Sequence, residues 1–203
     1  MMCIFMYGLK ILRKRLNNDV QIETMFNVLE RVARVDPKYT DIVLLENYAA
    51  FQNNLYELAN AVPALGRFYH IASDQYEQAR VRYISSIINH EFEKLFQFGQ
   101  KVENMLYTVP PEEVPSTYGL TRGEMRKLVK GCLSGVEKHV MSMYKRMQRQ
   151  ISSEELLPSL WDKCKDDFLD KYEALEALLA KCYSGETLVP SSKEMAGLFK
   201  NMY

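Results

Sequence analysis

The stretch from Ala64 to Leu106 constrains the fold more than any other part of this 203-residue sequence. It contains no proline and, after its first turn, one glycine, so nothing in it forces a helix to end. Its apolar residues recur at steps of three and four, which is the spacing of one helical face. At 1.5 Å per residue, the pattern predicts a single helix roughly 60 Å long. The apolar positions are Leu65, Phe68, Ala72, Tyr76, Ala79, Tyr83, Ile87, Leu95, Phe98, Val102 and Met105.

Five further segments have the same three-and-four spacing, and none shows the period of two that is typical of a half-buried strand. Asp36 and Pro37 mark the end of the first helix, because a residue before proline avoids the helical conformation. Pro63 ends the second helix, and a cluster of prolines predicts a loop over 108–120. The predicted helices span residues 9–36, 38–62, 64–106, 121–151, 154–183 and 192–202.

Three helix starts have the sequence of a capping box, in which Ser or Thr and a Glu three residues later satisfy free amides at the helix start. Pro158 lies near one of these starts, and residues 152–157 are therefore either part of the helix or a separate turn before it. Gly131 and Gly135 are expected to let a neighbouring helix approach closely. The three boxes are Thr121 with Glu124, Ser152 with Glu155, and Ser191 with Glu194.

Helices joined by short connections that prolines bound are expected to run up and down against one another. The segment 122–149 has eight Lys or Arg and two Glu, whereas 154–181 has eight Asp or Glu and four Lys. Opposite charge on consecutive helices favours side-by-side packing, with the charges meeting along the seam. The fold class predicted is therefore all-α, an elongated up-and-down helical bundle, with residues 1–203 as a single module.

The overall composition excludes several functional classes. Lys plus Arg and Asp plus Glu number 26 each, so no basic field favours nucleic acid. The four cysteines are far apart in the sequence, which indicates a reducing, cytosolic environment. The apolar run at the start is about seven residues long and precedes the basic residues, so neither a signal peptide nor a membrane span is expected. This abrupt apolar start also suggests that the sequence is cut from a longer chain.

Cys164 lies between Lys163 and Lys165, an arrangement that lowers the pKa of a thiol if both ammonium groups face the sulfur. Consecutive helical residues point about 100° apart, however, so the lysines flank the sulfur without covering it. Because Cys164 falls on the apolar stripe with Leu160 and Phe168, we expect it to be buried in the core.

No other motif indicates catalysis or a bound metal. His70 and Asp74 share a helical face, but a metal site requires three or four ligands. The "HEFEK" sequence at His90 lacks the second histidine of a zinc motif. The "GCLSG" sequence at 131–135 has its serine one place too late for a nucleophile elbow, and no strand precedes it. No enzyme activity, cofactor or metal is expected.

Two basic clusters and one tryptophan are the candidate interaction residues. The basic clusters either face solvent or an acidic helix, or bind anionic lipid headgroups or an acidic protein face. Trp161, the only tryptophan, lies beside the apolar stripe, where it either covers the seam with the basic helix or faces a partner. The basic residues are Lys10, Arg13, Lys14 and Arg15, and then Arg122, Arg126, Lys127 and Lys130.

Three stretches carry a more specific signal: "YGLKILRKRLNNDVQIETMFNVLERVARVDPKYTDIVLLENYAAFQNNLYELANAVPAL", "FEKLFQF" and "SEELLPSLWDKCKDDFLDKYEALEALLAKCY". They resemble the C-terminal end of the plant Sec-three subunit of the exocyst, in the exocyst complex component 1 family. The resemblance spans roughly residues 6–183 and rests on extended similarity.

This resemblance implies a helical-rod subunit of the complex that tethers secretory vesicles to the plasma membrane. The partners it implies are other exocyst subunits, with small-GTPase effectors or scaffold proteins as further candidates. It also implies a cytoplasmic chain, peripheral at the plasma membrane and on vesicles. The family's lipid-binding and coiled-coil regions lie upstream and are expected to be absent from this chain. The alternative function is a peripheral membrane protein that binds anionic lipids through a basic helix face.

Overall fold

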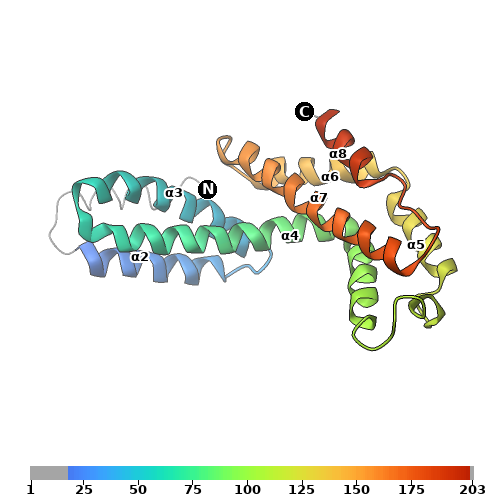
Figure 1. Cartoon of the computed structure of the whole chain (residues 1–203). Coiled ribbons are helices and arrows are strands. Elements are labelled where there is room, and N and C mark those ends of the chain that lie inside the picture. Colours follow the sequence, from blue (N-terminus) through green and yellow to red (C-terminus); the bar gives the residue numbers. More distant parts are fainter. Residues whose placement is uncertain (1–17, 202–203) are drawn as a thin grey trace. The chain divides into compact units, whose positions relative to one another are not determined.

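The computed structural model describes residues 18–201 of the chain, and within this range it contains seven α-helices, two short 3-10 helices and no strand (Figure 1). The all-α prediction is confirmed. No helix of the described range is long and apolar enough to cross a membrane. The chain divides into two compact units, Met1–Tyr83 and Ile84–Tyr203, and the boundary falls within the long helix α4, Gly66–Met105. The 40 residues of α4 confirm the uninterrupted helix that the sequence predicts.

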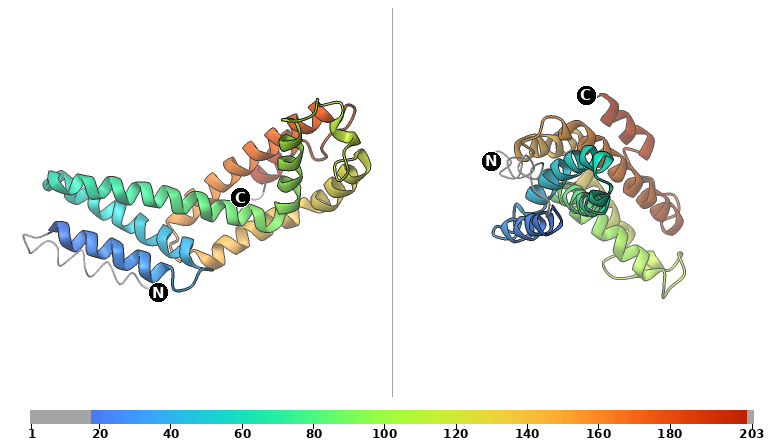
Figure 2. Two further views of the ribbon diagram at one scale, coloured as in Figure 1. Left: turned by 90° about the horizontal axis from the view of Figure 1, so that it is seen from below. Right: turned by 90° about the vertical axis from the view of Figure 1, so that its left-hand side faces the viewer.

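Unit 1 contains α2, Asn18–Ala33, then α3, Thr40–Ala61, the 3-10 helix η1, Pro63–Leu65, and the first half of α4 (Figures 1 and 2). Its core is an aromatic cluster centred on Phe26 of α2. The Phe26 ring centroid lies 5.0 Å from Phe51, 5.5 Å from Tyr48 and 6.3 Å from Phe68. These contacts join α2 to both α3 and α4, because each helix directs its apolar stripe towards the other two.

Val32 and Val62 continue the three-and-four spacing of the first two predicted helices, yet both are exposed. Val32 is 52% exposed because Ala33, one residue on, takes the core-facing position and is 2% exposed. Val62 is 41% exposed because α3 ends at the residue before it, so the helical spacing no longer sets its direction. The stripe prediction is therefore wrong at the ends of α2 and α3.

Unit 2 contains the second half of α4, the 3-10 helix η2, Val114–Ser116, and four further helices (Figure 1). The stripe predicted for α7 is confirmed, since Leu160, Cys164, Phe168 and Tyr172 are all fully buried. Phe168 packs on Phe92 of α4 with ring centroids 4.9 Å apart. The four helices are α5, Arg122–Leu133, α6, Val136–Gln150, α7, Leu156–Cys182, and α8, Ser192–Asn201.

The helix predicted over 121–151 is wrong in one respect, because it is two helices that meet at Gly135. This glycine has φ +69°, a left-handed conformation that other residues adopt only at a cost, and it starts α6. A Cβ built on Gly131 or Gly135 meets no atom within 4 Å, so the predicted close helix approach is wrong for both. The glycine at a close approach is Gly99, whose Cβ would lie 2.7 Å from Leu175 Cδ1.

The capping boxes at Thr121 and Ser191 are confirmed. The Ser191 amide and hydroxyl donate to Glu194 at 2.7 and 2.9 Å, and the Glu194 amide donates back to the hydroxyl at 3.3 Å. The third helix start differs, since α7 begins at Leu156, with Pro158 as its third residue. Proline is tolerated there because the first amides of a helix have no partner within it.

The seam between α6 and α7 is aromatic, and the expected meeting of opposite charges along it is wrong. Tyr144 of α6 packs on Trp161 of α7 with ring centroids 5.2 Å apart. Among residues 18–201, no ion pair joins these two helices. The ion pairs of the basic segment are made with Glu91 on α4 and Glu186 after α7.

Candidate interaction surface

The basic face predicted on α5 is partly neutralised by the chain itself. Arg126 Nε donates to both carboxylate oxygens of Glu186, each at 3.0 Å. Arg122 donates to the carbonyl oxygen of Ser184 at 2.9 Å, and its guanidinium lies 3.9 Å from Glu186. The hydrogen bonds from Arg126, together with the two guanidinium charges, lower the pKa of Glu186. Glu186 therefore remains ionised and reduces the positive potential of this face.

The rest of the predicted basic residues divide into two groups. Lys127 and Lys130 are exposed on α5, and within residues 18–201 neither forms an ion pair. The other four, Lys10, Arg13, Lys14 and Arg15, lie outside the described residues.

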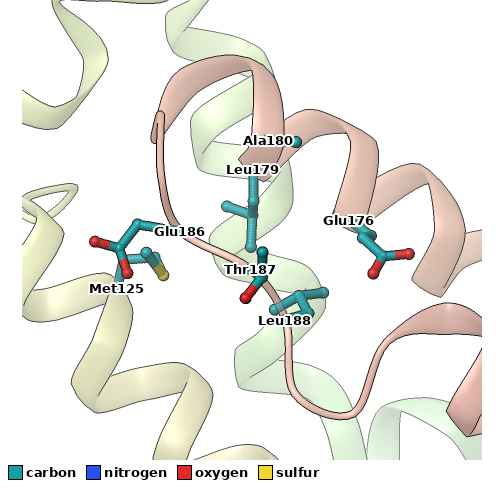
Figure 3. Close-up of a pocket in the computed structure, with 7 residues that line it drawn as sticks. All are labelled: Met125, Glu176, Leu179, Ala180, Glu186, Thr187 and Leu188. Carbon is teal, nitrogen blue, oxygen red and sulfur yellow. The ribbon is translucent and has the colours of Figure 1, made fainter.

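A pocket of about 210 Å³ lies beside the Arg126–Glu186 pair (Figure 3). Glu176, at its edge, accepts a hydrogen bond from the Ser192 amide at 3.2 Å, which ties α7 to the start of α8. The pocket can hold an apolar side chain, but its two carboxylates are engaged in hydrogen bonds. Its lining residues are Met125 from α5, Glu176, Leu179 and Ala180 from α7, and Glu186, Thr187 and Leu188 from the segment that follows.

Trp161 lies in the interior rather than on a surface that a partner can reach. It is 3% exposed, and its ring packs between Tyr144 of α6 and Phe199 of α8, with centroids 5.2 and 5.8 Å away. Of the two places that the sequence left open, the structure shows the one at the seam with the basic segment. Sequence reasoning missed the contribution of α8, which supplies Phe199.

The structure shows Cys164 to be a core residue. Its side chain is fully buried, and burial raises the pKa of the thiol to about 12. Thiolate is the reactive form of cysteine, so at neutral pH this residue is inert while the protein is folded. The flanking lysines do not activate it, and Lys165 instead forms an ion pair with Asp162 at 2.8 Å.

Sequence reasoning also missed a polar cluster that joins α4 to α6. One carboxylate oxygen of Glu91 is hydrogen-bonded to His139 Nδ1 at 2.7 Å, and the other accepts a hydrogen bond from the Ser142 hydroxyl at 2.7 Å. Burial alone would raise the pKa of Glu91, but these hydrogen bonds and the nearby imidazole groups outweigh it, so the pKa is lowered. The serine donates to the carboxylate and not to the imidazole, so the cluster lacks the order of a catalytic triad.

This cluster has a structural use in that it fixes the register of α6 on α4. His139 and Ser142 are three residues apart on one face of α6, but Glu91 is about fifty residues away in sequence, which hid the set from pattern analysis. Within the described range, no group of three or more His, Cys, Asp or Glu residues could hold a metal ion.

Comparison with known proteins identifies a family. Residues 15–185 match the family described as "Exocyst complex component Sec3, C-terminal". The chain is 57% identical over 181 residues to exocyst complex component SEC3A of Arabidopsis thaliana. This alignment covers 89% of this chain and 20% of that protein. It is 25% identical over 170 residues to exocyst complex component 1 of Dictyostelium discoideum, and 28% identical over 168 residues to that of Mus musculus.

These last two alignments cover 83% and 81% of this chain, and 19% of each relative. The chain thus spans about a fifth of the length of the curated relatives it matches. No solved structure matches it.

Proposed function

Because the chain belongs to the family of the C-terminal region of the exocyst subunit Sec3, we propose that it acts as a non-enzymatic helical module of the exocyst. In this role it contributes to vesicle tethering at the plasma membrane through helix–helix contacts with other exocyst subunits. Its place is cytoplasmic, peripheral at the plasma membrane and on secretory vesicles. Small-GTPase effectors and scaffold proteins are further candidate partners.

The observation that carries this proposal is the use the chain makes of its reactive groups. The buried thiol of Cys164 and the carboxylates of Glu91 and Glu186 all serve packing or hydrogen bonding within the chain. We therefore assign the function to the outer surface of the helices, since such surfaces bind other helices by fitting side-chain ridges into grooves. This supports a scaffold role over catalysis.

Co-purification tests the proposal. The tagged chain is recovered from secreting cells, and the accompanying proteins are identified by mass spectrometry. We expect other exocyst subunits in amounts that approach that of the tagged chain. Recovery of no exocyst subunit, from cells in which the complex itself is intact, contradicts the proposal.

The alternative function, binding of anionic lipid through a basic helix face, has weaker support. Arg122 and Arg126 are engaged by Glu186, which leaves Lys127 and Lys130 as the exposed cations of this face on α5. A basic residue near an anionic surface contributes about 1 kcal/mol, so two such residues give marginal affinity. Flotation with vesicles that contain or lack acidic lipid tests this alternative, and salt-sensitive binding to the acidic vesicles alone would support it.

A further inference from the structure

An open groove of about 400 Å³ runs along unit 2 between α4 and α7. It lies apart from the α5 surface and from the pocket beside Glu186. Apolar and small residues form much of its lining, and the polar residues among them are exposed. The lining consists of Phe96, Gly99, Gln100 and Glu103 from α4, and Lys171, Ala174, Leu175 and Leu178 from α7.

The groove exists because α4 and α7 run parallel and approach closely at one point. Phe92 of α4 packs on Phe168 of α7, and Gly99 lies against Leu175. The second contact is seven residues after the first on both helices, so the two helices run in the same direction. At that point a Cβ on residue 99 would lie 2.7 Å from Leu175 Cδ1. Because Gly99 has no side chain, Leu175 packs against the α4 backbone, and both residues line the groove.

The dimensions of the groove suit a helix. The wall on α4 extends from Phe96 to Glu103 and the wall on α7 from Lys171 to Leu178, so each wall comprises eight residues, whose seven helical steps cover about 10.5 Å. That is the distance between residues i and i+7 of a third helix, whose apolar residues at i+3 and i+4 would lie over the centre. Ala174 is small and exposed at this centre, so the backbone of the third helix can approach closely.

The charges of the groove set which of its ends receives an acidic residue of the bound helix and which receives a basic one. Because α4 and α7 are parallel, Lys171 lies at the end of the groove near Phe96, and Glu103 lies at the other end on the opposite wall. Neither residue forms an ion pair with any part of the chain between residues 18 and 201; Glu103 accepts a hydrogen bond from Gln100 at 3.1 Å. A helix with an acidic and a basic residue seven positions apart complements both ends at once.

The geometry points to one occupant: an amphipathic helix of another exocyst subunit, seated between α4 and α7 with an acidic residue at Lys171 and a basic residue at Glu103. This inference rests on the proposed function and names the surface by which the chain performs it. A lipid surface does not suit the groove, because anionic headgroups are repelled by Glu103 at one end. The mixed charge also distinguishes the groove from the basic face of α5.

Ala174→Trp tests the inference, because it fills the groove from an exposed position and leaves the core packing of α7 unchanged. The matched control is Ala177→Trp, also exposed on α7 but outside the groove lining. Both tagged variants are compared with the unaltered chain by co-purification of exocyst subunits, after circular dichroism has established equal thermal stability. We expect Ala174→Trp to lower recovery at least tenfold and Ala177→Trp to leave it unchanged.

Two further variants keep the test decisive if Ala174→Trp alters folding. Lys171→Glu and Glu103→Lys change exposed charges, and each is expected to lower recovery severalfold, with a smaller effect at high salt. A photo-crosslinking residue at position 174 should form an adduct with a helix of an exocyst subunit.

The outcomes separate this inference from the function on which it rests. Adducts with a second copy of the chain or with lipid overturn the inference, as does undiminished recovery by both Ala174→Trp and the charge variants. In those cases the proposed function stands, since exocyst subunits are still recovered. Recovery of no exocyst subunit by the unaltered chain contradicts the proposed function and, with it, this partner.

Discussion

Tyrosine hydroxyls link segments in both units of the chain, but they donate to backbone carbonyls in unit 2 and to a carboxylate in unit 1. Unit 2 joins distant segments with buried or half-buried polar links: the Tyr183 hydroxyl donates to the Leu120 carbonyl at 2.7 Å, and the Tyr172 hydroxyl donates to the Pro190 carbonyl at 2.6 Å. In the described part of unit 1, the Tyr48 hydroxyl donates a hydrogen bond to the Glu30 carboxylate at 3.0 Å.

The surfaces of the two units differ in how many large apolar side chains they expose. Within residues 18–201, nine of the twelve exposed large apolar side chains belong to unit 1, among them Val20, Val28 and Val35 on or just after α2. The cores of both units are buried, so the difference lies at the surface, where exposed apolar area favours association. Among the described residues, unit 1 thus exposes more apolar side chains than unit 2, and the variants below compare the two cores.

The largest expected effect comes from a cavity in the core of unit 2. Phe168 is fully buried against Phe92, Phe96, Tyr172 and Phe199, so Phe168→Ala is expected to lower the free energy of unfolding by about 3–5 kcal/mol. Trp161 lies in this core, and its fluorescence during urea denaturation measures the loss.

The matched variant in unit 1 is Phe26→Ala, which opens a cavity against Tyr48, Phe51 and Phe68. We expect the midpoint reported by Trp161 to change little, because this cavity belongs to the other core. Equal shifts of the urea midpoint that Trp161 fluorescence reports in both variants would show that the two units unfold as a single cooperative core, contrary to this prediction.

The second prediction concerns how tightly unit 2 excludes solvent at Cys164. Cys164→Ser places a hydroxyl in an apolar interior, which costs about 1–3 kcal/mol. In the unaltered protein at neutral pH, a thiol reagent should modify the half-buried Cys132 before Cys164, which should react only as unit 2 unfolds. Modification of Cys164 in the folded protein at the rate of a free thiol would show that the interior of unit 2 is open.

The third prediction compares the polar links directly. Tyr183→Phe removes the buried donor to the Leu120 carbonyl and is expected to cost about 1–3 kcal/mol, since that acceptor is left unsatisfied. Tyr48→Phe in unit 1 leaves the half-buried Glu30 near water and should cost less, about 0.5–1.5 kcal/mol. Denaturation followed by circular dichroism measures both costs, and a larger loss for Tyr48→Phe would reverse the predicted order.

The smallest effect is a pH dependence in unit 2. The pKa of Glu91 is lower in the folded protein than in the unfolded chain, so its contribution to stability is present above the unfolded pKa. That contribution is lost as the pH falls through the folded pKa. The Trp161 unfolding midpoint should therefore fall between pH 5 and pH 3, and by less in Glu91→Gln. An equal fall of the unfolding midpoint in the unaltered protein and in Glu91→Gln would show that Glu91 does not cause the pH dependence.

The periodic spacing of apolar residues was enough to predict most of the fold. The uninterrupted stripe of α4 and the full stripe of α7, with Cys164 on it, are present as predicted. The break at Gly135 was not predictable, because the step of four from Cys132 to Val136 continues the helical rhythm across it. Glycine is permitted inside a helix, and its positive φ leaves no mark on the spacing.

The candidate surface was less accessible to sequence reasoning, because it depends on contacts between distant residues. The sequence presented Arg126 as a candidate interaction residue, but in the fold Glu186 pairs with it. It also left open an exposed position for Trp161, which Phe199 of α8 contacts in the interior. The groove beside Gly99 could not be foreseen for the same reason, since it requires the parallel register of α4 and α7.

Recruitment in living cells tests the central claim most directly. The fluorescently tagged chain is followed at the plasma membrane of secreting cells before and after depletion of another exocyst subunit. If the chain acts through contacts with other subunits, its membrane foci should disappear when the complex is depleted. Foci that persist at full intensity without the complex would contradict the claim and favour direct binding to lipid.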